Sequence, residues 1–200
     1  MEFYWKSEGN PSKLGIFSGT FHPPTRAHLG LARAALEAVD EVLFVLPHRF
    51  PHKEYEEVDF EDRLRMLLAA TAGEPRFSVA ASKGGLFIEI ARECREAYGP
   101  GPELWFLCGR DAAERIINWD YGELGAFEKM LQEFGLLVAD RDGHYEPPAK
   151  WRDRIRPLKT PEDYSGISAS SVRENIARGK RWEHLVPGTI VGLVRETYSR

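Results

Sequence analysis

Short runs of apolar residues alternate along the chain with longer segments in which apolar residues recur every three or four positions. The continuous short runs are typical of strands buried on both faces, and they predict strands at 14–18, 42–46, 77–80, 104–108, 136–139 and 155–158. The three-to-four spacing is typical of amphipathic helices, and it predicts helices at 27–39, 60–71, 86–98, 171–178 and 189–198.

Strands that alternate with helices predict a parallel sheet with helices on both faces. We therefore expect an α/β fold of Rossmann-like type in a single domain over residues 1–200, with residues 1–13 as an N-terminal extension. Such sheets bind ligands beyond the carboxyl ends of their strands, where the strand order reverses. Residues 18–28, 47–53 and 109–119 follow predicted strands and are the segments to examine.

Composition and charge narrow the function classes. The chain has 27 Lys and Arg against 31 Asp and Glu, a formal net charge of −4, which argues against a protein that holds nucleic acid by bulk positive charge. No apolar stretch is long enough to span a membrane, and the first 13 residues lack the apolar core of a signal peptide. Cys94 and Cys108 form no metal-ligand pattern, and their usage fits a reducing cytoplasm.

The first segment with chemistry is residues 19–28, G-T-F-H-P-P-T-R-A-H, between a predicted strand and a helix. Gly19 allows a ligand close to the backbone, and the N-terminus of the helix attracts anions. Thr25 and His28 are three residues apart and share a face of its first turn, where they suit phosphate oxygens. A proline-rich turn capped by Thr25, with His28 at the surface, explains the same residues equally well.

The second segment is residues 167–173, I-S-A-S-S-V-R, at the start of a predicted helix. Hydroxyls and backbone N–H groups favour an anion there, and Arg173 adds a planar cationic group. The competing interpretation is a plain capping box between Ser171 and Glu174.

Together these segments resemble the nucleotidylyltransferase superfamily, which has an early (H/T)-x-G-H loop and a late I-S-x-(S/T)-x-x-R segment. The chain is most similar to bacterial nicotinate-nucleotide adenylyltransferases, and the resemblance runs from about residue 14 to residue 194. The matching motifs, in order, are 19–23 (G-T-F-x-P), 25–28, 51–53 (P-H-K), 63–66 (R-L-x-M), 109–111 (G-x-D), Trp119, 167–173 and 179–187 (G-x-x-x-x-x-L-V-P).

The resemblance implies an HxGH-type nucleotidylyltransferase fold and transfer of AMP from ATP to the phosphate of a mononucleotide. Its catalytic residues would be His28, Thr25 and Arg173. Residues 166–200 would be a helical part that completes the ATP site, and Mg²⁺ would accompany ATP. The implied ATP-binding residues are Gly19, Thr20, Phe21, His28, Gly109, Asp111, Ile167, Ser168, Ser170 and Arg173.

The implied acceptor-binding residues are His22, Lys53, Phe87 and Trp119. Several have simpler explanations: Lys53 as a solvated side chain, Trp119 as a lid or core anchor, and Asp111 as the cap of a helix that begins at Ala112. His22, His48 and His52 have no fixed metal-ligand spacing, so we predict no protein metal site. Arg152, Arg154 and Arg156 alternate like the solvated face of a strand.

The expected activity is formation of nicotinate adenine dinucleotide from nicotinate mononucleotide and ATP, as part of NAD biosynthesis. Three departures from the family pattern keep alternatives open. Histidine stands at position 22, Ala27 replaces the glycine of the (H/T)-x-G-H motif, and residues 85–87 (G-L-F) replace a family S-Y-T stretch. The alternatives are another acceptor, such as nicotinamide mononucleotide or phosphopantetheine, and a noncatalytic nucleotide-binding module. Expected partners are ATP and a small phosphorylated acceptor, without nucleic acid or membrane, and a homo-oligomer is compatible with the sequence.

Overall fold

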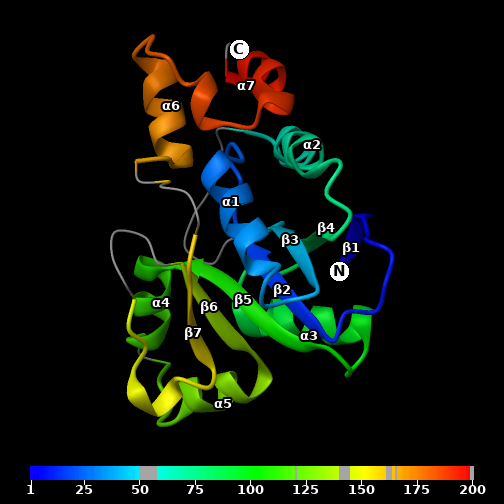
Figure 1. The fold of residues 1–200 in the computed structure, drawn as a ribbon, viewed down its shortest axis with the longest axis vertical. Helices are drawn as coiled ribbons and strands as arrows, with labels where there is room; N and C mark the ends of the chain where they lie inside the picture. The colour runs from blue at the N-terminus through cyan, green and yellow to red at the C-terminus, as the bar shows by residue number, and fades with distance from the viewer. Residues whose placement is uncertain (50–57, 120, 140–144, 161–163, 165, 199–200) are drawn as a thin grey trace.

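The computed structural model describes residues 1–49, 58–119, 121–139, 145–160, 164 and 166–198 (Figure 1). Seven strands in these ranges form one sheet in the order β1-β4-β3-β2-β5-β6-β7. β2 to β7 run parallel, and β1 pairs antiparallel with β4 at one edge. The strands are β1 (Glu2–Trp5), β2 (Lys13–Ser18), β3 (Glu41–Pro47), β4 (Phe77–Ser82), β5 (Glu103–Gly109), β6 (Gly135–Ala139) and β7 (Ile155–Leu158).

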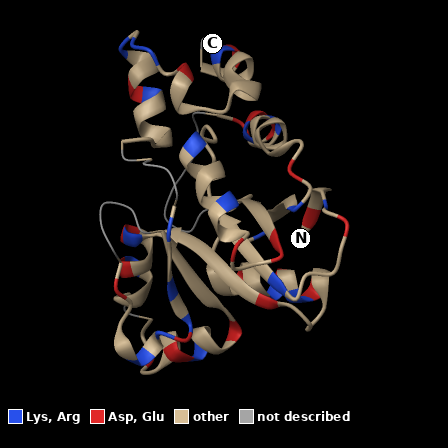
Figure 2. Cartoon of the chain, in the orientation of Figure 1, with Lys and Arg blue, Asp and Glu red and all other residues tan. Residues whose placement is uncertain are grey.

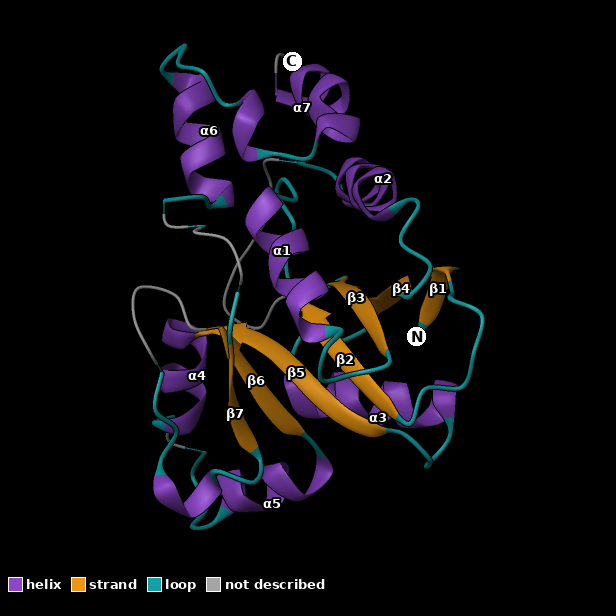
Figure 3. Cartoon of the chain, in the orientation of Figure 1, coloured by secondary structure: helices purple, strands orange, loops and turns teal. Residues whose placement is uncertain are grey.

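The order of the parallel strands is that of a Rossmann fold, because the chain runs outward from β2 to one edge and then returns to add β5, β6 and β7 on the other side. The order therefore reverses between β2 and β5. The predicted fold class is confirmed, and Figure 3 shows the helices around the sheet. They are α1 (Arg26–Ala35), α2 (Phe60–Thr71), α3 (Phe87–Tyr98), α4 (Arg110–Ile117), α5 (Ala126–Glu133), α6 (Ala169–Ala177) and α7 (Val191–Tyr198).

Two hydrophobic clusters cover the two faces of the sheet, which explains why the strands are apolar at consecutive positions. On one face Phe17 and Phe44 pack with Leu29 of α1 and Leu67 of α2. On the other face Phe106 and neighbouring strand residues pack with α3 and α5. Figure 1 shows α1 and α3 on opposite sides of the sheet.

A third hydrophobic cluster seats the C-terminal helices. Met66 and Ala70 of α2 pack there with Val172 of α6, Trp182, and Val194 of α7. Figure 1 shows α6 and α7 beyond the sheet, close to α2 and to one end of α1. This cluster carries the 167–173 segment toward the carboxyl ends of the strands.

Several elements differ from the predictions. Residues 1–13, expected to be an extension, contain β1. The first helix ends at Ala35 rather than 39, because the chain turns where Glu37 N–H donates to the Ala34 carbonyl. α5 was not predicted, and α4 was expected only as a possible helix from Ala112 and begins two residues earlier; each has eight residues and buries only one or two of them. α6 begins at 169, two residues earlier than predicted.

The arginines around β7 are largely solvated, as expected, since Arg152 and Arg156 are exposed and Arg154 is half-buried. The guanidinium groups of Arg154 and Arg156 lie 5.6 and 4.5 Å from the ring centroid of Trp105. Gly135 of β6 makes this possible, because a side chain there would overlap the Trp105 ring. Two of the three arginines thus cover a buried tryptophan.

None of the helices in the described ranges has the length and apolar character needed to cross a membrane.

Candidate active site

The start of α1 holds Thr25 and His28 together. Thr25 is the N-cap and is fully buried, and its hydroxyl accepts from the His28 backbone N–H at 3.4 Å. In return, the Thr25 backbone N–H donates to His28 Nδ1 at 2.9 Å, and Thr25 Oγ1 lies 2.8 Å from the same nitrogen. This is a capping box with histidine at the third helical position. The predicted cap and the predicted histidine are therefore one structural unit.

The hydrogen bond from the Thr25 backbone N–H to His28 Nδ1 assigns the tautomer of His28. A backbone N–H can only donate, so Nδ1 must be the unprotonated nitrogen of the neutral ring. The proton of neutral His28 therefore sits on Nε2, which is then a donor. The ring is also packed against Phe17 and Phe21, at centroid distances of 5.8 and 5.4 Å. Backbone and aromatic contacts together hold the imidazole in one orientation.

Phe21 shapes the loop between β2 and α1. Its backbone has φ of +46°, a region that non-glycine residues seldom occupy. Its ring is buried and meets Phe17 and Phe44 at centroid distances of 5.5 and 5.6 Å. Burial of this ring offsets the cost of the backbone conformation. The side chain of Phe21 belongs to the core, so its predicted role toward ATP concerns its backbone alone.

His22 lies inside the protein rather than in an open cleft. Its side chain is 1% exposed and stacks on Tyr198 of α7, with ring centroids 5.4 Å apart. Burial, followed by the positive charges of Arg173 and Arg63, lowers the pKa of His22 from 6.5 to about 4. His22 is therefore neutral at physiological pH. The predicted contact between His22 and an acceptor is untested, while the contact that the structure gives this ring is Tyr198.

Two arginines from distant parts of the chain bind carbonyl groups of the same loop. Arg63 of α2 donates to the Thr20 carbonyl at 3.4 Å, and Arg173 of α6 donates to the His22 carbonyl at 2.6 Å. Arg173 and His22 are 151 positions apart in the sequence. The hydrogen bond from Arg173 joins the start of α6 to the loop that precedes α1. Residues 19–28 and 167–173, the two segments predicted to bind phosphate (the phosphate segments), are therefore in contact.

The polar side chains at the start of α6 have two roles: one pair caps the helix, and the other pair faces outward. Ser168 is the N-cap and forms a capping box with Ser171: Ser168 Oγ accepts from Ser171 N–H at 3.0 Å, and Ser171 Oγ accepts from Ser168 N–H at 2.9 Å. The alternative capping box at Ser171–Glu174 was wrong by three residues. Ser170 is exposed and accepts from Arg173 Nη2 at 3.4 Å. Ser170 and Arg173 therefore form the side of this turn that is open to a ligand.

The charge at the two helix starts fits an anion. α1, α6 and α7 have no acidic residue in their first turns, whereas α2, α3, α4 and α5 each have at least one. An acidic side chain at a helix N-terminus neutralises its partial positive charge, so α1 and α6 retain theirs. Figure 2 shows Lys and Arg on α1, and residues of both charges on α6.

Gly109 and Asp111 lie at the strand end next to the first loop, because β5 pairs with β2. Gly109 ends β5 and is the N-cap of α4, and Asp111 is exposed in the first turn. Asp111 is therefore not the cap of a helix starting at Ala112, as the simpler interpretation had it. Its carboxylate is accessible, and its predicted contact with ATP is untested.

The predicted acceptor residues lie in different parts of the chain. Phe87 is half-buried at the start of α3 and stacks on Phe106 with centroids 4.2 Å apart, as part of the core. Trp119 follows α4 and is 49% exposed. Lys53, together with the rest of the P-H-K motif, lies outside the described residues. An acceptor site built from these residues remains a prediction.

Within the ranges that the structure describes, no group of three or more His, Cys, Asp or Glu side chains is placed to hold a metal ion. His22 and His48 stack on different rings, those of Tyr198 and Phe60. His52 lies outside the described residues. The groups at the two helix starts are an imidazole, hydroxyls and a guanidinium, which are suited to phosphate oxygens.

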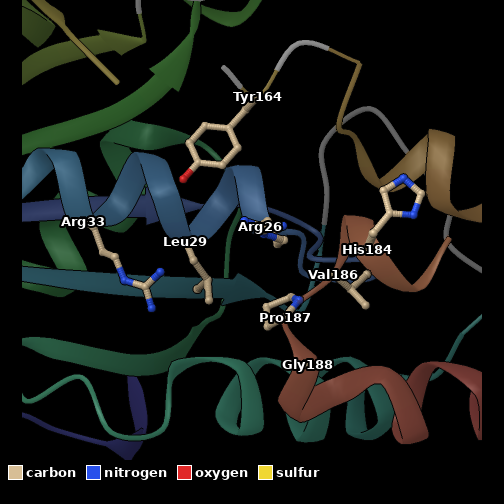
Figure 4. A pocket seen from close by; sticks show the side chains of 8 residues that line it. All are labelled: Arg26, Leu29, Arg33, Tyr164, His184, Val186, Pro187 and Gly188. Atoms are coloured by element: carbon tan, nitrogen blue, oxygen red, sulfur yellow. The ribbon is translucent and has the colours of Figure 1, made fainter. Parts of the chain in front are cut away.

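A cavity of about 370 Å³ lies on the other side of α1 (Figure 4). Arg26, Leu29 and Arg33 line it from α1, and Tyr164 and residues 184 and 186–188 line it from the C-terminal part. The α1 residues are spaced three and four apart, so they form one face of the helix, and His28 lies on a different face. The cavity shares Arg26 with the 19–28 segment but lies on the side of α1 away from His28.

Arg63 and Tyr198 are contacts of the site that were not predicted as site residues. Arg63 was noted only as part of a motif, yet it is 5% exposed. Its position in the helical pattern, among Phe60, Leu67 and Ala70 at spacings of three, four and seven, placed a charge on the buried face. That signal could have identified it. No comparable signal marks Tyr198.

The Cytidylyltransferase-like family matches residues 16–175, which include both phosphate segments. The chain belongs to this family and is a nucleotidyltransferase.

Among its relatives, a protein of Moorella thermoacetica is 31% identical over 202 residues, covering 92% of this chain and 90% of the relative. A protein of Solibacter usitatus is 35% identical over 187 residues, covering 89% and 94%. Both are named "Probable nicotinate-nucleotide adenylyltransferase". The fold is similar to that of Plasmodium falciparum nicotinic acid mononucleotide adenylyltransferase complexed with NaAD, with a TM-score of 0.70, 19% identity and coverage of 94% and 97%.

Proposed function

We propose that the protein transfers AMP from ATP to the phosphate of nicotinate mononucleotide, forming nicotinate adenine dinucleotide and pyrophosphate. The observation that carries this proposal is the hydrogen bond from Arg173 to the His22 carbonyl, since it brings the α6 segment to the loop that presents His28. The names of the relatives support the choice of acceptor.

In this reaction a phosphate oxygen of the acceptor attacks the α-phosphorus of ATP, and the bond from that phosphorus to the pyrophosphate oxygen breaks. The attacking phosphate is already ionised at neutral pH, so the site needs no strong general base. The site instead has to position the reactants and stabilise the negative charge that moves to the leaving pyrophosphate.

The described residues divide this work between the two helix starts. His28 donates from Nε2 to the α-phosphate, while Thr25 fixes the ring through Nδ1. Ser170 and Arg173 bind the β- and γ-phosphates and steady pyrophosphate as it leaves. Thr20, Phe21 and Gly19 contribute backbone along the phosphate path. Gly109, Asp111 and Ile167 bind the remainder of ATP.

ATP enters this scheme as its Mg²⁺ complex. Mg²⁺ prefers oxygen ligands and retains water, so phosphate oxygens of the substrate and water can hold it without a protein cage. The two buried thiols, Cys94 and Cys108, are unpaired, and we place the activity in the cytoplasm, whose reducing conditions suit them.

Pyrophosphate release tests the proposal. The purified protein is given Mg²⁺, ATP and, in separate reactions, nicotinate mononucleotide, nicotinamide mononucleotide or phosphopantetheine. We expect the highest kcat/KM with nicotinate mononucleotide. A higher value with another acceptor replaces the proposed substrate, and ATP binding without release with any acceptor favours the noncatalytic nucleotide-binding module.

A second candidate for the acceptor is nicotinamide mononucleotide, and it rests on the residues at the start of α3. Residues 85–87 start α3 without hydroxyls, and Phe87 faces the core instead of a cleft. Nicotinamide mononucleotide differs from the nicotinate form by an uncharged amide in place of a carboxylate. The side-by-side reactions with these two nucleotides distinguish them.

A further inference from the structure

A glycine in the middle of α1 makes room for an aromatic ring from the C-terminal part. A methyl group added at Gly30 would overlap the Cε2, Cζ and Oη atoms of Tyr164. Figure 4 shows the Tyr164 ring beside α1 with its hydroxyl directed toward the helix. Glycine is unfavourable inside a helix, so this contact gives position 30 a structural reason to lack a side chain.

Tyr164 lies directly before the segment that begins α6. Its carbonyl accepts from the Ile167 backbone N–H at 3.0 Å, and Gly166 between them has φ of +73°. Ser168, the N-cap of α6, comes next. Any shift of Tyr164 is therefore passed within four residues to the turn that carries Ser170 and Arg173.

Gly30 is two residues after His28 on α1. Residues at this spacing lie on nearly opposite faces of a helix. Tyr164 therefore contacts α1 on the side away from His28, while Arg173 binds the His22 carbonyl in the loop before α1. The α6 segment is attached to the β2–α1 unit at two separate points.

We propose that Tyr164 is a positioning residue for nucleotide binding: its ring rests on the bare backbone of Gly30 and sets the place of Ser170 and Arg173 relative to His28. The inference rests on the proposed function only in that these groups bind the phosphates of ATP. Tyr164 itself touches neither substrate in this scheme.

The test compares Gly30→Ala with Gly192→Ala. Both replace a glycine of a helix with a stronger helix former, but Gly192 lies in the first turn of α7, where a methyl group meets nothing within 4 Å. For each variant the melting temperature, the Kd of a Mg²⁺-bound ATP analogue that cannot be cleaved between its α- and β-phosphorus, and the KM of each substrate are measured.

We expect Gly30→Ala to remain folded and to bind the analogue about tenfold more weakly, a shift of about 1.4 kcal/mol, with the KM of the acceptor unchanged. Gly192→Ala should raise the melting temperature by up to about 2–4 °C with analogue binding unchanged. The proposal would be overturned if neither variant lost affinity for the analogue. It would also be overturned if both variants lost the same amount.

Tyr164→Ala completes a double-mutant cycle. The single change should weaken analogue binding as well, and adding Gly30→Ala to it should cause no further loss, because the ring that the methyl group displaces is gone. An undiminished additional loss contradicts the proposal. If Gly30→Ala does not fold, Tyr164→Ala decides alone: unchanged analogue binding in that variant also overturns the proposal.

Failure of the proposed function gives a different result. Absence of adenylyl transfer in the unmodified protein with every acceptor would refute the activity, while the analogue-binding comparison still tests Tyr164. Normal transfer with equal analogue affinity in all variants would refute the positioning role alone.

Discussion

The phosphate side of the site and the acceptor side differ in how firmly the fold holds them. On the phosphate side, Thr25 is buried, His28 accepts a backbone hydrogen bond, and Arg173 is bound to a loop carbonyl. On the acceptor side, Phe87 packs into the core and Trp119 is half exposed. The groups predicted to bind phosphate are therefore held by hydrogen bonds to the backbone, whereas of the two groups predicted for the acceptor one packs in the core and the other is half exposed.

This difference has a chemical reason. Charge stabilisation requires donors that are fixed before the charge develops, since reorganisation at that moment would add to the barrier. Recognition of a flat ring requires only an aromatic surface of adequate area. A fold that fixes the charge-stabilising donors and leaves the aromatic surface adjustable can retain its reaction while its acceptor changes.

We expect the largest effect on kcat from removal of the His28 imidazole, the donor that Thr25 holds in place. His28→Ala should lower kcat by about 10²- to 10³-fold, by analogy with the loss of one charge-stabilising donor, and should change the KM of both substrates little. Steady-state pyrophosphate release measures both parameters. An unchanged kcat would remove His28 from the proposed role.

His184→Ala is the matched control for this variant. His184 is exposed in the 3₁₀ helix Glu183–Leu185 and has no part in the proposed chemistry. Its kcat should equal that of the unmodified protein. A comparable loss in His184→Ala would show that the effect of His28→Ala is not specific to the phosphate side.

Arg173→Ala should have the next largest effect. It removes both a phosphate ligand and the hydrogen bond to the His22 carbonyl, and a charged hydrogen bond contributes about 1.5–3 kcal/mol. We expect kcat/KM for ATP to fall about 10- to 100-fold. Arg173→Lys keeps the charge without the planar group and should fall less. Equal activity of the alanine variant would separate α6 from the site.

A pH-dependent loss of stability should follow from His22. Burial and two arginines lower its pKa from 6.5 to about 4, so the folded state takes up a proton less readily than the unfolded state. The stability that depends on neutral His22 is complete above about pH 6.5 and is lost as the pH falls toward 4. Its contribution to the free energy of unfolding should drop by about 2 kcal/mol between pH 7 and pH 5.

His22→Phe provides the comparison, because it keeps an aromatic ring against Tyr198 and removes the titrating group. Urea unfolding at a series of pH values measures the difference between the two proteins. We expect the variant to gain relative to the unmodified protein below pH 6.5. A constant difference from pH 7 to pH 4 would mean that His22 titrates normally in the folded protein.

The smallest effect is expected on the acceptor side. Trp119→Ala should raise the KM of the acceptor about 5- to 10-fold through loss of stacking and leave the KM of ATP and the melting temperature unchanged. Trp5→Ala in β1 is the control, since Trp5 is exposed to a similar degree at 58%. A rise in the KM of ATP alone would place Trp119 on the phosphate side.

Most of the sheet and the two phosphate segments could be predicted from the sequence. β3, β4, β5 and β6 are buried at consecutive positions, which is the pattern of strands covered on both faces, whereas β7 at the edge exposes its two middle residues. β1 was missed because it has four residues at a sheet edge and buries little. Thr25 and His28 were predicted because a strand end, a helix start and a resemblance coincide in one short segment.

The remaining contacts depend on residues that are far apart in the chain. The burial of His22 requires Tyr198 of α7, and the place of Arg173 requires the His22 carbonyl. Neither pairing leaves a periodic signal in the sequence. The capping box at Ser168 was also displaced by three residues, because three serines within 168–171 make several helix starts chemically equivalent.

In the proposed reaction the two helix starts hold the phosphates of ATP while its α-phosphorus is transferred to a mononucleotide. ATP labelled at either the α- or the γ-phosphorus, supplied with Mg²⁺ and nicotinate mononucleotide, tests this directly. We expect the α-label in nicotinate adenine dinucleotide and the γ-label in pyrophosphate. Appearance of the γ-label on the acceptor or as inorganic phosphate, with no α-label in a dinucleotide, would contradict it.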